Sequence, residues 1–137
     1  FCGYNFADYF AHWLSFDRPG ARLPAIFHVN WFRKGDDGKF LWPGFGDNLR
    51  VLEWIIGRVE GSAGAVETPI GHLPAEADLN LEGVALSDEA RAKLFGLDHA
   101  GWQAEFASIG RDLEDYGPRL PEALRREQQR IARALAA

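Results

Sequence analysis

The sequence predicts a mixed α/β fold, with a strand, a hairpin and a helix in its front half and a helical C-terminal half. Most of the 10 Phe, 5 Trp and 3 Tyr lie before Ile55, where glycine and proline break short apolar segments. Apolar residues at helical spacing begin after Asp47 and recur through the acidic last third. With 137 residues, 47% of them hydrophobic, the chain is long enough for one modest core.

The first expected element is a short helix. Asn5 or Asp8 provides its N-cap, because both side chains accept hydrogen bonds from N–H groups of a first helical turn. The helix runs through Leu14, and residues 17–20 (DRPG) end it as a turn.

Residues 25–32 are expected to form a buried strand, on which Asn30 shares a face with Phe32. Residues 35–38 (GDDG) have turn chemistry, so the strand is expected to pair with residues 39–42 as a hairpin. The two aspartates are assigned to the turn and not to a metal.

A helix is predicted from Asp47 to about Arg58, with Gly61 ending it. Trp54 lies off the apolar stripe of this helix and is expected to cover a neighbouring element. The stripe itself is expected to be buried, and it comprises Val51, Leu52, Ile55, Ile56 and Val59.

Residues 61–77 read as a connection whose most structured part is 68–71 (TPIG). Three helices should follow, and they are packing elements by default. They are a helix capped by Ser87 and running through Phe95, a helix capped by Asp98 with Trp102, Phe106, Ile109, Leu113 and Tyr116 on one side, and a charged helix starting at Pro121 with Leu124, Ile131 and Leu135 as its stripe.

Composition excludes several classes of function. The net charge is −5, with the acidic excess after residue 58, and the chain has no basic stripe, so nucleic-acid binding is not expected. No apolar run is long enough to span a bilayer. The single cysteine, Cys2, excludes an internal disulfide and fits a reducing, cytoplasmic compartment. The absence of methionine predicts that the sequence begins inside a longer polypeptide.

No catalytic or metal-ligating set is predicted in this chain. The four histidines lack the i,i+4 spacing of a helical zinc site, and no serine has a nucleophile-elbow context. No G-x-x-x-x-G-K-[ST] loop is present to cradle phosphates. A nucleotide that meets this chain would therefore meet it through the base.

Residues 28–48 are the most informative stretch, because five aromatic rings lie in and around glycine-rich loops. Ordinary burial of these rings is one interpretation, since aromatic residues dominate cores. The other is that the rings bind a flat ligand, because loop segments stay near solvent and leave their side chains accessible. Asn48, at the expected helix start, carries both a donor and an acceptor on one side chain. Rings beside such an amide indicate a purine-base site.

The string closely resembles the C-terminal part of GTP-dependent phosphoenolpyruvate carboxykinases over the whole chain, more weakly after about Gly83. So dense an aromatic string is very specific. The matching segments are 1–6 (FCGYNF), 8–9, 12–14, 26–34 (IFHVNWFRK), 38–46 (GKFLWPGFG), Asn48, 50–52, Trp54, 68–71 and 79–83.

The resemblance implies an enzyme that converts oxaloacetate and GTP to phosphoenolpyruvate, CO2 and GDP in gluconeogenesis, a decarboxylating lyase. It implies Mn2+ at the catalytic centre and Mg2+ with the nucleotide, both held by residues before Phe1, and a monomeric parent. The chain would be part of the nucleotide-binding lobe of a larger two-lobed enzyme and inactive alone. Its partners would be a guanine nucleotide and the upstream part of the same enzyme.

By similarity, this chain supplies the guanine pocket. The expected division is residues 1–60 for base binding, 61–80 as a connection and 81–137 as a helical C-terminal portion. Three rings would enclose the base and the following segment would provide polar contacts, with Asn48 reading the base. The nucleotide-binding residues are Phe32, Phe40, Phe45, Gly46, Asp47 and Asn48.

Two positions depart from the family pattern: Cys2 replaces a usual phenylalanine, and Leu49 stands where a small polar residue is usual. The first puts packing at the edge of the substrate site in doubt, and the second affects only the exterior of the helix start. Two other functions stay open from the residues themselves. One is a non-catalytic binding module whose rings take a sugar or a peptide, and the other is an inert folding fragment with exposed apolar surface.

Overall fold

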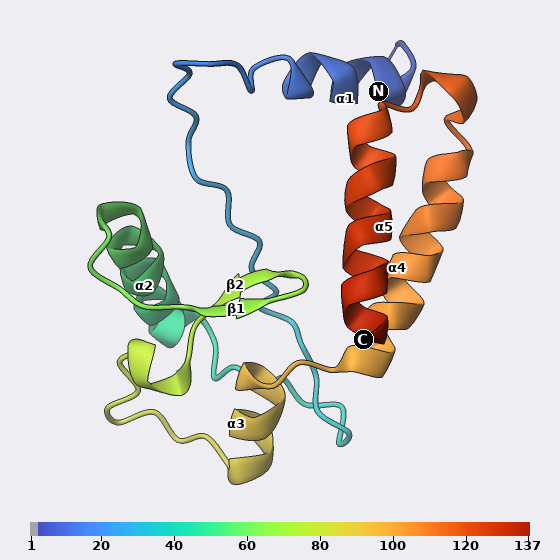
Figure 1. Cartoon of the computed structure of the whole chain (residues 1–137). Helices are drawn as coiled ribbons and strands as arrows, with labels where there is room; N and C mark the ends of the chain where they lie inside the picture. The colour runs from blue at the N-terminus through green and yellow to red at the C-terminus, as the bar shows by residue number, and fades with distance from the viewer. Residues whose placement is uncertain (1–2) are drawn as a thin grey trace. The chain divides into compact units, whose positions relative to one another are not determined.

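The computed structural model of the chain describes residues 3–137 (Figure 1). Cys2, expected to be reduced and unpaired, lies outside the described residues. The chain forms two compact units, one containing the residues up to Pro24 together with His99–Ala137, the other containing Ala25–Asp98. The division into base-binding, connecting and helical portions is a functional one, and it stays a prediction.

The first unit is helical. The Asn5 Oδ1 atom accepts a hydrogen bond from the Ala7 N–H at 2.8 Å, which confirms Asn5 as the N-cap of the first helix. The predicted turn follows it, with the Ala21 N–H donating to the Arg18 carbonyl. The elements of this unit are α1 (Phe6–Leu14), α4 (His99–Glu114), the 3-10 turn η3 (Gly117–Arg119) and α5 (Glu122–Ala136).

Helices α4 and α5 lie side by side (Figure 1). The predicted apolar side of α4 is half-buried along its length, and Leu135 of α5 is only 2% exposed. Two glutamine side chains join the helices: Gln103 Nε2 donates to the Leu135 carbonyl at 2.6 Å, and Gln128 Nε2 donates to the Phe106 carbonyl at 2.8 Å. Pro121 is the N-cap of α5 and not its first helical residue, so the helix begins one residue later than predicted.

Two contacts hold α1 to the end of the helical pair. The rings of Phe10 and Tyr116 meet edge to face with centroids 5.7 Å apart. Arg119 Nη1 lies 3.1 Å from Asp8 Oδ2. Because both side chains of that ion pair are more than half exposed, the ring contact contributes more to this junction.

The second unit contains the only sheet in the described part of the chain. Its strands are antiparallel, with Thr68 opposite Gly71, so the predicted structured part of the connection is a hairpin turn. The fold is therefore mixed and helix-rich with a small sheet. The elements are η1 (Phe45–Asp47), α2 (Asn48–Glu60), β1 (Val66–Thr68), β2 (Gly71–Leu73), η2 (Glu76–Asp78) and α3 (Asp88–Phe95).

The predicted buried strand over residues 25–32 was wrong. The segment has no regular secondary structure up to Asn30 and turns at 31–32, it pairs with no strand within residues 3–137, and Ile26 is 88% exposed. At its end the Asn30 Oδ1 atom accepts from the Phe32 N–H at 2.9 Å and turns the chain. The expected hairpin is reduced to a single antiparallel bridge between Lys34 and Phe40. A strand needs a neighbour to satisfy its backbone groups, and no described segment supplies one.

The predicted helix from Asp47 is α2, and Gly61 ends it with φ +76°. Its burial differs from the prediction, because Val51 and Ile55 of the expected apolar stripe are only half-buried and its other three residues are exposed. Trp54 is the buried residue, at 6% exposure. Its indole meets the Phe27 ring at 6.0 Å and donates from Nε1 to the Gly64 carbonyl at 3.0 Å. The tryptophan therefore covers a neighbouring segment, as expected. The exposed apolar residues of this helix are Leu49, Leu52, Ile56 and Val59.

Helix α3 begins as predicted, with Ser87 Oγ accepting from the Ala90 N–H at 3.1 Å. It ends at Phe95, as predicted. Among the described residues, none of the helices combines the length and apolar character needed to cross a bilayer.

Replacing Trp54 with phenylalanine is expected to lower the free energy of unfolding by about 1–2 kcal/mol, because the Gly64 carbonyl loses its donor. Urea unfolding of the chain followed by circular dichroism measures the change. Glu53→Ala, at an exposed position of the same helix, is the control and should stay within about 0.5 kcal/mol of the parent. Equal effects for the two variants would contradict the packing described for Trp54.

Candidate functional site

A tight reversal of the chain brings two of the predicted ring residues together. The Leu41 N–H donates to the Arg33 carbonyl and the Gly35 N–H to the Lys39 carbonyl, both at 2.9 Å. This pairing places the Phe32 and Phe40 rings edge to face, with centroids 5.8 Å apart and planes at 62°.

Side chains around the turn stabilise the reversal. The Lys39 N–H donates to Asp37 Oδ1 at 2.9 Å, and this hydrogen bond holds the pKa of the Asp37 carboxyl below its usual value. Lys93 of α3 lies 2.7 Å from Asp36 and 2.9 Å from Glu89, and these carboxylates raise the pKa of its ammonium. The aspartates therefore serve the turn, as predicted, and Asp36 also attaches the turn to α3.

The predicted ring residues stay at the surface. Phe32 is 71% exposed, Phe40 is 55% exposed and Phe45 is 93% exposed. Lys34 Nζ lies 5.5 Å from the centre of the Phe40 ring, within cation–π distance. Phe45 belongs to no ring pair within the described part of the chain, so the structure brings together two of the three predicted rings. Ordinary burial does not account for any of them.

The polar half of the site is the start of α2. Gly44 has φ +121°, a conformation that favours glycine, and it turns the chain into the 3-10 turn that carries Phe45, Gly46 and Asp47. Gly46 is exposed, so its backbone is open to a ligand. Asn48, the first residue of α2, is half-buried.

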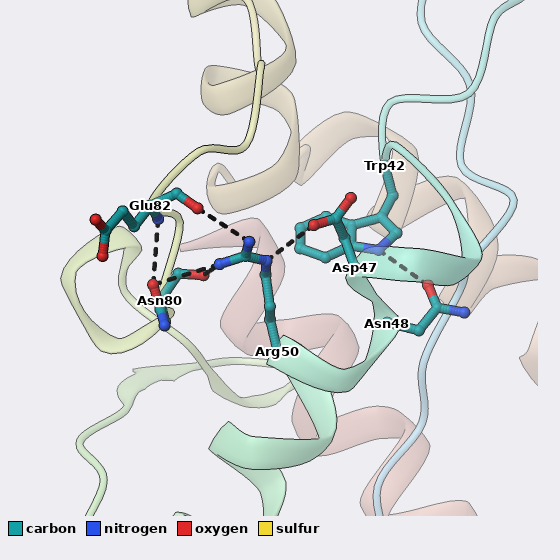
Figure 2. A network of polar contacts seen from close by, with 6 residues as sticks. All are labelled: Trp42, Asp47, Asn48, Arg50, Asn80 and Glu82. Carbon is teal, nitrogen blue, oxygen red and sulfur yellow. Dashed lines mark hydrogen bonds and ion pairs between the residues drawn. The ribbon is translucent and has the colours of Figure 1, made fainter.

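Both polar side chains of the site have partners that sequence reasoning missed (Figure 2). Trp42 Nε1 donates to Asn48 Oδ1 at 3.0 Å. Arg50 Nε donates to Asp47 Oδ1 at 2.9 Å, so Asp47 is paired within the chain. Trp42 and Arg50 were recognised only as members of the motif. A hint was present, since Arg50 lies three residues after Asp47, a spacing that lets side chains meet on a helix.

Arg50 also fastens the loop that follows the hairpin (Figure 2). Its Nη1 atom donates to the Asn80 carbonyl at 2.7 Å, and its Nη2 atom donates to the Glu82 carbonyl at 2.9 Å. Asn80 in turn accepts from the Glu82 N–H at 3.2 Å through its side chain. One guanidinium therefore joins the start of α2 to residues 80–82, and this bracing limits movement of Asp47 and Asn48.

The arrangement can bind a flat ring and present polar groups to its edge. Exposed rings supply faces for stacking, and the start of α2 supplies an amide and open backbone. Residues 3–137 contain no cluster of three or more His, Cys, Asp or Glu side chains placed to hold a metal ion.

Comparisons with known proteins agree with the motif. A family model described as the phosphoenolpyruvate carboxykinase C-terminal P-loop domain matches residues 1–134. The chain is 50% identical over 137 residues to the GTP-dependent phosphoenolpyruvate carboxykinase of Chlamydia caviae, covering 98% of this chain and 23% of that protein. The enzyme of the same name from Neocallimastix frontalis is 50% identical over 142 residues, with the same coverage. That from Treponema pallidum is 49% identical over 128 residues, covering 91% of this chain and 21% of its own length. The chain thus spans less than a quarter of these relatives.

Proposed function

The chain belongs to the family of GTP-dependent phosphoenolpyruvate carboxykinases, and we propose that it supplies guanine recognition in such an enzyme. The whole protein, called here the full-length enzyme, would convert oxaloacetate and GTP to phosphoenolpyruvate, CO2 and GDP in the cytoplasm. The observation that carries the proposal is the exposed Phe32–Phe40 ring pair followed by Phe45 and a half-buried Asn48.

Stacking would hold the base without identifying it. A base against an aromatic face gains about 1–3 kcal/mol, and every base has such a face. Phe32, Phe40 and Phe45 expose enough ring surface for this role. Exposed phenylalanines are costly to keep in water, which supports an occupant for this surface.

Polar groups on the base edge would identify guanine. Guanine presents an acceptor at position 6, where adenine presents an amino group. Asn48 and the open backbone at Gly46 can form hydrogen bonds with the edge of guanine. Against adenine the same groups would be left unpaired. Asp47 would act through its ion pair with Arg50, which fixes the start of α2.

Surface outside the pocket supports a further part of the same polypeptide as partner. The face of α2 formed by Leu49, Leu52, Ile56 and Val59 is apolar and 44–70% exposed. Residues 25–30, which belong to no helix or strand, also lack a pairing strand within the described residues. Both features suit packing against the rest of the nucleotide-binding lobe in a monomeric full-length enzyme. Within this lobe residues 1–60 would bind the base, 61–80 would connect, and 81–137 would form the helical portion.

The metals of the proposed reaction would be bound elsewhere. Mn2+ and Mg2+ prefer ligand sets that include carboxylate oxygens or imidazoles. By the family resemblance, their ligands would lie outside this chain. The phosphate loop would lie outside it as well. Identity near 50% over almost the whole chain favours this function over a sugar-binding or peptide-binding module and over an inert fragment.

The proposal is tested by assaying GTP-dependent formation of phosphoenolpyruvate from oxaloacetate in the presence of Mn2+. The full-length enzyme should be active with GTP, and this chain alone should be inactive. Activity of the full-length enzyme with ATP equal to that with GTP would contradict guanine recognition.

A further inference from the structure

We propose that Trp42 is a positioning residue for nucleotide selection, fixing the Asn48 amide so that its Nδ2 group faces position 6 of the purine. The inference rests on the proposed function, because it deepens the role of the same site. It assigns a task to a tryptophan that does not belong to the ring set expected to enclose the base.

The indole of Trp42 determines which way the amide points. An indole N–H can only donate, so its partner at 3.0 Å must be the amide oxygen of Asn48. The two ends of an amide otherwise look alike, and a weaker neighbour would leave the orientation open. The chemistry of the donor therefore settles the orientation of this side chain.

Trp42 is well anchored for this task. Its side chain is only 6% exposed, and the preceding Leu41 is 8% exposed. The Leu41 N–H is also held by the Arg33 carbonyl at 2.9 Å. A donor that is fixed in this way costs less conformational entropy than a mobile one when the site is used.

The acceptor is anchored too. Asn48 is the first residue of α2, and Arg50 braces this helix start by pairing with Asp47 and with the carbonyl groups of Asn80 and Glu82. Figure 2 shows the amide nitrogen of Asn48 on the side away from Trp42. Within residues 3–137 no acceptor holds this nitrogen, so its two N–H groups are available to a ligand.

A presented N–H group discriminates at position 6 of a purine. The O6 atom of guanine accepts a hydrogen bond, whereas the N6 amino group of adenine is a donor and would meet a second donor. If the amide rotated by half a turn, its oxygen would face the base and the preference would reverse. Trp42 prevents that rotation, because its N–H would then face the amide nitrogen.

The test uses Trp42→Phe in the full-length enzyme and compares kcat/KM for GTP with that for ATP. A second probe is the triphosphate of 2,6-diaminopurine riboside, which keeps the 2-amino group of guanine and carries an amino group at position 6. We expect the preference for GTP over both competitors to fall about tenfold, through KM more than kcat.

The matched control is Trp54→Phe. Trp54 is also 6% exposed and also donates at 3.0 Å, but its acceptor is the Gly64 carbonyl and not Asn48. This variant should lose stability and keep the GTP preference of the parent. If both variants lose the preference equally, the effect is general loosening and the positioning role is overturned.

Asn48→Ala separates this inference from the proposed function. If it lowers the preference while Trp42→Phe does not, the positioning role fails and guanine recognition stands. If neither substitution changes the preference, base reading by Asn48 fails as well. In the double variant the tryptophan change should add nothing to the alanine change. Should Trp42→Phe fail to fold, 3-benzothienylalanine at position 42, which replaces only the N–H by sulfur, gives the same comparison.

Discussion

Replacing Asn48 with alanine in the full-length enzyme should lower kcat/KM for GTP by about 10- to 100-fold, with little change for ATP. The reason is asymmetric pairing. With GTP the variant leaves the O6 acceptor of a partly buried base without its donor, whereas adenine has no acceptor at that position to lose. Steady-state kinetics with both nucleotides over a range of concentrations measures the ratio directly.

Asn48→Asp sharpens this prediction. A carboxylate oxygen can still accept from Trp42 Nε1, so the structural hydrogen bond at 3.0 Å is kept. The second carboxylate oxygen cannot donate a hydrogen bond to the O6 atom of guanine. It can accept one from the N6 amino group of adenine. GTP preference should therefore fall below that of Asn48→Ala. Full retention of the preference in both variants would remove Asn48 from base recognition.

Truncating Phe45 should weaken the binding of GTP and ATP equally, unlike the Asn48 substitutions, because any base can stack on a ring face. Phe45→Ala in the full-length enzyme is expected to raise KM for GTP and for ATP by about tenfold, with kcat nearly unchanged, since stacking contributes about 1–3 kcal/mol per base. The ring is 93% exposed, so the melting temperature of the nucleotide-free enzyme should stay the same.

A second exposed ring provides the control for Phe45. Phe16 is 42% exposed and lies outside the 28–48 segment, and Phe16→Ala should leave KM for both nucleotides unchanged. If Phe45→Ala also leaves both constants unchanged, Phe45 does not enclose the base. If it alters only the constant for GTP, the ring reads the base and the division between stacking and selection is wrong.

Local signals predicted the helices well, because each cap and apolar spacing acts within a few residues. Asn5 and Ser87 cap α1 and α3, and Gly61 ends α2, as their residue types indicated. The strand over 25–32 failed because pairing is not local. Its apolar alternation indicated a strand, but the described chain holds no neighbouring strand for it.

The prediction of which residues of α2 are buried failed for a related reason. Most of the apolar stripe identified by spacing is exposed within the described residues, and the off-stripe Trp54 is covered because it reaches Phe27 and the Gly64 carbonyl. Spacing along a helix says which residues share a face. It does not say which face a neighbour covers.

The candidate site also has a part that the sequence predicted and a part that it did not. Its rings and Asn48 follow from residue types in a loop and from the family motif. The pairing of Asn48 with Trp42, six residues away, and of Arg50 with residues 80–82 depends on how the loop turns at Gly44 and where the later loop packs. Such contacts join separate segments of the chain, and local sequence patterns do not predict which segments come into contact.

The most direct measurement is a calorimetric titration of this 137-residue chain with GDP and, separately, with ADP. Because the rings at 32, 40 and 45 would hold the base and Asn48 would select guanine, GDP should bind and ADP should bind much more weakly. Equal binding of the two nucleotides would mean that the rings stack without reading the base. Absence of heat with either nucleotide would mean that this chain needs the rest of the enzyme in order to bind the base.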